Sequence, residues 1–224
     1  MSIRRPSKDQ PASFDWLPEN AEWCDAQIAK YPKGRQASCV IPLLWRGQKQ
    51  EGWISIPMME VIAEQLSMPY IRVYEVASFY TMFNLEPVGD FFIQLCGTTP
   101  CMLRGAHDLR DACKRIIGPE GSISPDGKFS WLEVECLGAC CNAPMVQVSC
   151  NHHDHYYEDL TAESFERLLD QFAQGEMPKP GTVNPLRHTS DPEGENTTLL
   201  DPTLYDGHRA APIKIPNVET IESE

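Results

Sequence analysis

Two cysteine pairs in this sequence have spacings that suit metal ligands. They are Cys96-Gly-Thr-Thr-Pro-Cys101 and Cys136-Leu-Gly-Ala-Cys140, and each lies where a short apolar segment gives way to a loop. A 2Fe-2S cluster needs four thiolates, two on each iron, and loops that converge at one end of a sheet supply them without interrupting the strands. The pattern therefore predicts a cofactor-binding site for one 2Fe-2S cluster, with these four cysteines as its metal ligands.

Each cysteine pair contains a glycine. Gly97 and Gly138 allow the backbone to approach a cluster closely and to direct N–H groups at the sulfurs. Hydrogen bonds of this kind stabilise the extra negative charge of a reduced cluster. We expect both glycines to act in this way.

Three other uses of paired cysteines compete with this interpretation. Structural zinc also takes four thiolates, but its loops usually carry a tight C-x2-C pair. A thiol-disulfide enzyme needs a C-x2-C motif at the start of a helix, and the sequence contains none. Four buried structural thiols are a third alternative, although two close pairs at corresponding strand ends favour a shared ligand.

The other five of the nine cysteines serve as an internal contrast. Cys113 lies in an apolar helical pattern, which predicts an unreactive core thiol. Cys24, Cys39 and Cys150 have no partner at ligand spacing. Cys141 adjoins the second pair and could form a C-x4-C motif with its first cysteine, so spacing alone leaves its role open.

No second chemical site stands out in the sequence. His152, His153 and His155 are expected at a solvated hairpin tip and receive no role. The sequence has neither a G-x-G-x-x-G motif nor a P-loop, so nicotinamide chemistry would fall to a partner protein. We assign no catalytic residue to this chain.

Composition excludes several classes of function. With 32 acidic against 19 basic residues, the formal charge of −13 would repel a nucleic-acid backbone. The 224 residues contain no apolar stretch long enough for a membrane span, and the polar start does not resemble a secretory signal. An odd number of cysteines without a signal is typical of a reducing compartment.

The segments that must position these residues fall into two halves. The first half has helical periodicity throughout, clearest where Met58, Ile62 and Leu66 share one face. We predict helices at 20–31, 36–50, 55–67 and 70–82.

The periodicity changes near residue 90. A strand at Phe91–Leu95 followed by a helix at Met102–Ile117 opens an α/β unit. Thr161 caps a last amphipathic helix that ends near Gly175 and should cover the sheet. Further strands are predicted at 129–135 and 145–149, with a hairpin turn at 151–154.

Four regions follow from these patterns: a lead-in at 1–19, a helical bundle domain at 20–86, an α/β cluster domain at 87–177 and an extended tail at 178–224. From Glu176 onward the chain holds seven of its 19 prolines and nine acidic against four basic residues. A segment of this composition buries little apolar surface by itself. We expect it to become ordered along a partner.

Several further motifs accompany the cysteines. They are Cys96-Gly-Thr-Thr-Pro-Cys101-Met-Leu-Arg-Gly105, Glu133-Val-Glu-Cys136-Leu-Gly-Ala-Cys140, Asn142-Ala-Pro144, Glu51-Gly-Trp53, Val76-Ala-Ser-Phe79-Tyr80 and Tyr157-Glu-Asp159-Leu-Thr161. On these motifs the sequence, over roughly residues 12–178, resembles the small 2Fe-2S subunit of the NADH dehydrogenase module of respiratory complex I. The tail segment Arg187-His-Thr-Ser190-Asp-Pro192-Glu-Gly194 looks like the C-terminal extension of mitochondrial and related bacterial forms.

This resemblance implies an α+β fold, in which an N-terminal helical bundle precedes a thioredoxin-like α/β 2Fe-2S domain and an extended, Pro-rich acidic C-terminal tail. It implies Cys96, Cys101, Cys136 and Cys140 as the ligands. Because family members commonly carry an aliphatic residue at the position of Cys141, the resemblance implies that Cys141 is not a ligand.

The resemblance further implies partners, namely the flavoprotein subunit that binds FMN and NADH and the large iron-sulfur subunit of complex I. The expected function is that of an electron-transfer subunit of NADH:quinone oxidoreductase, which exchanges one electron between the partner's FMN and its own cluster. The expected location is the cytoplasmic side of the bacterial inner membrane, or the matrix side in mitochondria, within a peripheral arm. The alternatives are the equivalent subunit of an NAD-linked hydrogenase or formate dehydrogenase and a free-standing thioredoxin-like ferredoxin.

Overall fold

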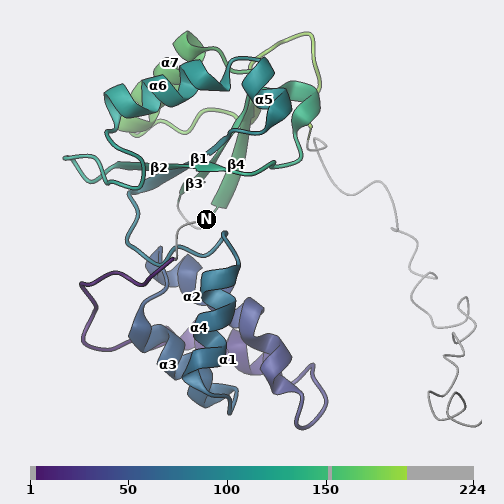
Figure 1. Ribbon diagram of the computed structural model, residues 1–224. Helices are drawn as coiled ribbons and strands as arrows, with labels where there is room; N and C mark the ends of the chain where they lie inside the picture. Colours follow the sequence, from purple (N-terminus) through teal and green to yellow (C-terminus); the bar gives the residue numbers. More distant parts are fainter. Residues whose placement is uncertain (1–3, 151–152, 191–224) are drawn as a thin grey trace, which may run out of the picture.

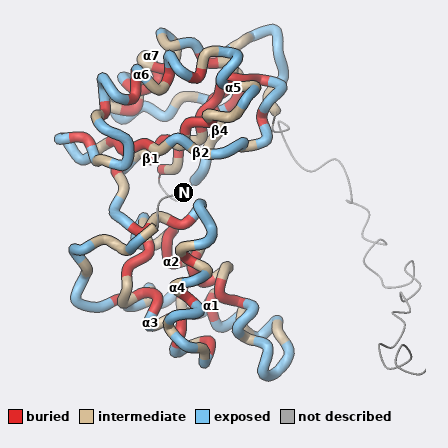
Figure 2. Tube along the Cα trace, viewed as in Figure 1, coloured by how far each residue is buried: buried red, intermediate tan, exposed pale blue. Residues whose placement is uncertain are grey.

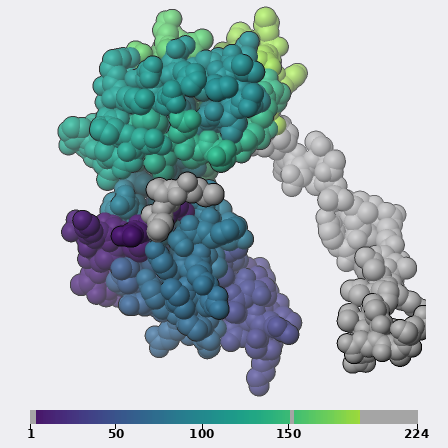
Figure 3. All heavy atoms as spheres, viewed as in Figure 1, coloured from purple at the N-terminus to yellow at the C-terminus, as the bar shows by residue number. Residues whose placement is uncertain are grey.

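A computed structural model describes residues 4–150 and 153–190 of the chain. Helices of the first half gather at one end of the molecule, and a sheet with helices on one face occupies the other end (Figure 1). Figure 2 shows buried residues in both halves, and the space-filling view in Figure 3 shows the two halves meeting at a waist. No helix in the described ranges is both long and apolar enough to cross a membrane.

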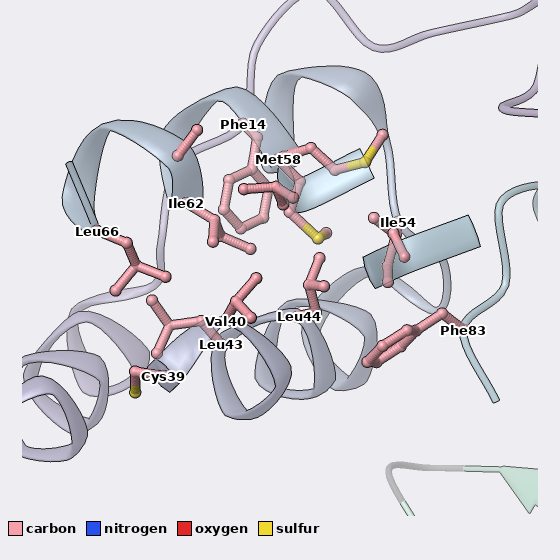
Figure 4. Close-up of a cluster of buried hydrophobic side chains, with 14 of the residues drawn as sticks. Phe14, Cys39, Val40, Leu43, Leu44, Ile54, Met58, Ile62, Leu66 and Phe83 are labelled. Carbon is pink, nitrogen blue, oxygen red and sulfur yellow. The ribbon is translucent and has the colours of Figure 1, made fainter. Parts of the chain in front are cut away.

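The first half is a helical bundle around its own apolar core. Ser55 caps one helix by accepting a hydrogen bond from the Met58 amide at 3.3 Å, and Pro57 suits the first turn of that helix. Leu43, Leu44 and Ile62 are fully buried where the helices meet (Figure 4). The structure confirms the four predicted helices. They are α1 (Pro18–Ile28), α2 (Val40–Glu51) with the short η1 (Gln36–Cys39) before it, α3 (Ile56–Gln65) and α4 (Tyr70–Phe79).

The second half is built on a five-stranded sheet in the order β2-β1-β3-β4-β5. The pairs β1–β2 and β4–β5 are parallel, whereas β3 is antiparallel to both of its neighbours. The strands are β1 (Phe91–Cys96), β2 (Phe129–Val134), β3 (Val146–Cys150), β4 (His153–Glu158) and β5 (Gly181–Thr182).

The two faces of the sheet have different surroundings. Ile93 and Leu95 of β1 are buried on the face covered by α6 (Ala106–Ile116) and α7 (Ala162–Ala173). Thr161 and Ser164 form a capping box that fixes the start of α7, as the sequence predicted for Thr161. Phe92 and Gln94, which alternate with them along β1, line a cavity shared with residues at the end of α2.

Polar contacts connect the bundle to that second face. The Lys49 ammonium at the end of α2 lies 2.6 Å from the Asp154 carboxylate of β4. Ser149 of β3 donates to the same carboxylate at 2.6 Å and accepts a hydrogen bond from Gln94 of β1 at 3.1 Å. A cavity of about 500 Å³ lies beside these contacts. The junction therefore contains an ion pair and hydrogen bonds, whereas the core of each half is apolar.

The prediction of a single helix at Met102–Ile117 is wrong. Two helices occupy this stretch, α5 (Thr99–Leu103) and α6. Gly105 separates them with a left-handed φ of 104°, a conformation that interrupts an α-helix and that glycine adopts readily.

The predicted tail at 178–224 is partly integrated into the fold. Gly181 is buried and pairs with Tyr157 of β4, which adds a strand that the sequence did not predict. The rest of the predicted tail, from residue 191, lies outside the described residues, as do positions 151–152 of the predicted hairpin turn. The histidines that follow, His153 and His155, belong to β4.

Gly89 offers a test of how closely the interdomain connection packs on the sheet. A Cβ at this position would lie 2.6 Å from the backbone carbonyl carbon of Phe129, and backbone atoms cannot rotate away. We expect Gly89→Ala to lower the free energy of unfolding by about 2 kcal/mol, as overpacking typically does. The exposed neighbour Asp90→Ala serves as the control. Equal denaturant midpoints for the two variants would show that the connection can shift at little cost in stability.

Candidate metal centre

The strand register brings the two cysteine loops to one edge of the sheet. Cys96 ends β1 and pairs with Val134, the last residue of the parallel strand β2. Cys136 follows only two residues later. Because parallel strands end at the same edge, the chain leaves both strands in one direction and carries both pairs to one place.

The first pair is buried. Cys96 and Cys101 are each 1% exposed, and Cys101 lies within α5. The Thr98 hydroxyl lies 3.4 Å from the Cys96 sulfur. Burial, reinforced by the neighbouring Cys96 thiol, raises the pKa of Cys101 to about 12. Burial thus disfavours the thiolate form of Cys101 unless a nearby cation offsets its charge.

The second pair is exposed to solvent. The sulfurs of Cys136 and Cys140 lie 3.3 Å apart. Two thiolates bound tetrahedrally to one metal at 2.3 Å would lie about 3.8 Å apart, so a small adjustment suffices to share an ion. The Gly138 amide donates to the Cys136 sulfur at 3.4 Å and, with Cys140, lowers the pKa of Cys136.

The two pairs lie close enough to influence each other. The hydrogen bond with Cys136 raises the pKa of Cys140, and negative charge on Cys96 raises it further. Charge on Cys140 in turn adds to the burial that raises the pKa of Cys101. Among the described residues, no three or more His, Cys, Asp or Glu side chains are grouped so that they could hold one metal ion. A 2Fe-2S cluster takes its thiolates as two pairs, one for each iron, and the four cysteines fit that requirement.

Small apolar side chains surround the buried sulfurs. The cluster of buried residues that contains Cys96 and Cys101 also contains three alanines and one methionine. Tyr156 packs against it and donates its hydroxyl proton to the Leu137 carbonyl at 2.7 Å. Little water can reach the inner pair. The apolar members are Ala106, Ala139, Ala143 and Met145.

Only one of the two glycines has the expected role. Gly138 donates to a cysteine sulfur and adopts a left-handed φ of 88°. The prediction for Gly97 is wrong, because its amide donates to the Val134 carbonyl at 3.2 Å. The Glu133 carboxylate, held by Arg110, occupies the space that a Cβ of Gly97 would need. That glycine makes room for a side chain instead of binding a sulfur.

The remaining cysteines differ from the four in their surroundings. Cys113 is fully buried in the sheet core, where burial raises its pKa to about 12, which confirms the predicted core thiol. Cys24 and Cys39 are buried in the bundle core and Cys150 at the end of β3. Cys141 is exposed, and its carbonyl accepts a hydrogen bond from Arg187.

Sequence reasoning placed the residues that hold the second loop in motifs that carry the resemblance, but it did not predict that role. Arg187, Glu158 and Asn142 contact this loop or one another at 16 to 46 residues' separation. None belongs to a spacing pattern that predicts such contacts. The pairing of residues 181 and 182 with β4 brings the segment that carries Arg187 close to the cysteines.

Comparison with solved structures shows the fold. The chain aligns with crystal structures of an NAD+-reducing [NiFe]-hydrogenase in the air-oxidised and H2-reduced states, with TM-scores of 0.52 and 0.51 at 15% and 17% identity. The alignments cover 61% and 62% of this chain but only 23% of each hydrogenase chain.

Sequence relatives are much closer. One NADH-quinone oxidoreductase subunit of Rhizobium meliloti is 49% identical over 90% of this chain and 74% of its own length. The corresponding NADH-quinone oxidoreductase subunit of Rickettsia bellii is 47% identical over 71% of this chain and 94% of its own length. The mitochondrial NADH dehydrogenase [ubiquinone] flavoprotein 2 of Dictyostelium discoideum is 43% identical over 90% and 81%, respectively.

The family model described as "Thioredoxin-like [2Fe-2S] ferredoxin" matches residues 24–173, which include all four proposed ligands and most of the bundle. The fold, the paired thiols at one sheet edge and the relatives agree with this match. The chain belongs to the thioredoxin-like [2Fe-2S] ferredoxin family.

Proposed function

We propose that this chain is the electron-transfer subunit of an NADH-quinone oxidoreductase and exchanges one electron with the FMN of a partner flavoprotein. The observation that carries the proposal is the meeting of two cysteine pairs at one sheet edge, one pair buried and the other exposed. When bound, a 2Fe-2S cluster supplies the one-electron couple. The chain itself breaks and forms no substrate bond.

Cys96, Cys101, Cys136 and Cys140 are the proposed ligands. The sulfurs of the second pair are 3.3 Å apart, and the strand register brings both pairs to one edge of the sheet, which supports a shared site. Burial of the first pair keeps water and oxidants from the inner thiols. The Gly138 amide, which donates to Cys136, would offset negative charge at the outer edge.

Surface residues near the cysteines suit a docked partner. Leu103, at the end of α5, is 76% exposed, and its neighbour Met102 is also exposed. A second apolar region lies at the end of α4, where Phe79 is 77% exposed beside Tyr80 and Met82. Neighbouring exposed apolar side chains of this kind suit a surface that a partner covers in the assembled complex.

The proposed partners are the FMN- and NADH-binding flavoprotein and the large iron-sulfur subunit of the complex. We further propose that the bundle at 20–86 secures the partner while the domain at 87–177 holds the cluster. The assembled complex would place the chain in a peripheral arm on the cytoplasmic side of a bacterial inner membrane, or on the matrix side in a mitochondrion.

Anaerobic purification tests the cofactor. The chain should contain two irons and two acid-labile sulfides, because four paired thiolates suit that stoichiometry. After reduction, electron paramagnetic resonance (EPR) should show the signal of a coupled Fe(II)–Fe(III) pair. Stoichiometric zinc without sulfide would favour the structural alternative.

Serine substitutions test the ligand set. Replacement of each proposed ligand should abolish or shift the EPR signal of the reduced cluster. Cys113→Ser, Cys141→Ser and Cys150→Ser are matched controls, and each should leave the spectrum unchanged. If Cys141→Ser destroys the signal while Cys140→Ser preserves it, the second pair is wrongly assigned. A shifted signal counts as involvement, since serine can itself bind iron.

Charged substitutions test the docking surfaces. Leu103→Asp and Phe79→Asp should each reduce the amount of flavoprotein that co-purifies with the tagged full chain, because a buried carboxylate is unfavourable in an apolar interface. The control is Ile123→Asp, at an exposed position on a loop after α6. If the Leu103 and Phe79 variants recover as much flavoprotein as the Ile123 control, neither surface takes part in docking. Co-purification of hydrogenase or formate dehydrogenase subunits would indicate the alternative complex.

A further inference from the structure

Residues 181–190, here called the strap, run from β5 past the loop that carries the second cysteine pair. Gly181 and Thr182 pair with the end of β4, which anchors the start of the strap to the sheet. The amide of Val183 also donates to the Glu158 carbonyl at 3.1 Å. The strap therefore has a fixed origin close to the cysteines.

Arg187 links the strap both to the cysteine loop and to the residue that follows β4. Its guanidinium donates to the Asp159 carboxylate and to the carbonyl of Cys141. Thr182 donates its hydroxyl proton to the other oxygen of the same carboxylate. Asp159 adopts a left-handed φ of 55°, which is uncommon for a non-glycine residue but is tolerated by aspartate.

A buried carboxylate provides a second link. Glu158 is 0% exposed and accepts hydrogen bonds from the Asn142 amide group at 2.6 Å and from the Ser190 backbone amide at 2.9 Å. The Ser190 hydroxyl donates to it as well. Asn142 also donates to the His188 carbonyl at 2.7 Å. Asn142, at the end of the cysteine loop, is thus held by the sheet and by the strap together.

These contacts converge on the loop of the exposed cysteine pair. Backbone bonds from Asp159 and Leu160 fix the chain at residues 142 and 144, and Tyr156 holds the Leu137 carbonyl. The strap adds the contacts at Cys141 and Asn142, directly after Cys140. The inner pair is instead fixed by burial around β1 and α5.

We propose that the strap positions the Cys136–Cys140 loop for cluster binding, with Arg187 and Ser190 as positioning residues. The inference rests on the proposed ligand set. Arg187 acts through the Cys141 carbonyl and Ser190 acts through Glu158 and Asn142, so neither touches the cluster itself. Loss of either contact lets the loop open locally without disturbing the sheet core.

The first measurement uses the full-length chain without its cluster. Amide hydrogen exchange of residues 136–144 should be faster in Arg187→Gln than in the parent, whereas exchange in α6 should be unchanged. Arg115→Gln is the matched control, because Arg115 also pairs with a carboxylate, Glu166, but between α6 and α7. Equal exchange of residues 136–144 in both variants would overturn the proposal.

The second measurement uses the cluster-loaded chain. We expect a chelator to remove iron from Arg187→Gln about tenfold faster than from the parent, since charged hydrogen bonds of this kind commonly suppress local opening to that extent. The g-values of the reduced cluster should shift, which global destabilisation alone would not cause. Arg115→Gln should keep the parent rate and spectrum.

Ser190→Ala is a milder second variant that removes only a hydroxyl, and it should also accelerate iron loss. It tests the proposal even if Arg187→Gln does not fold. Parent-like iron loss in both strap variants, with a normal 2Fe-2S centre in the parent, would overturn the role of the strap alone. A parent chain without iron and sulfide would overturn the proposed function and the strap inference together.

Discussion

Parallel pairing of β1 with β2 is the constraint on which the candidate centre depends. The register that sets Cys96 beside Val134 fixes where both cysteine loops begin. In an antiparallel pair the two strands would end at opposite edges, and the loops would lie a strand length apart. The helices α5 and α6 supply the connection that parallel strands require, and α5 itself carries Cys101.

The surroundings of the four thiols create an asymmetry across the site. The inner pair is enclosed by alanines and a methionine, while the outer pair faces solvent and has a backbone amide nearby. Charge is least unfavourable where water and N–H groups can stabilise it. A site of this kind combines a protected interior with an accessible edge, which is what electron exchange with a docked protein needs.

Sequence reasoning recovered the parts of the fold that depend on periodicity and on ligand chemistry. The bundle helices, the strand that ends at Cys96 and the cap at Thr161 follow from local patterns. The break at Gly105 was missed because an isolated glycine is compatible with an apolar helical pattern until the backbone geometry is known. The role of Gly97 was missed because the neighbour that needs its space, Glu133, lies on another strand.

The strap was missed for a different reason. A two-residue strand has no periodicity, and the segment is stabilised by polar contacts to Glu158 and Asp159 in place of apolar burial. Those contacts have a consequence for biosynthesis. Because a chain emerges from the ribosome N-terminus first, all four candidate ligands are made well before Arg187 and Ser190. The nascent chain thus passes through a stage in which the cysteine loop is complete in sequence but is still held from one side only.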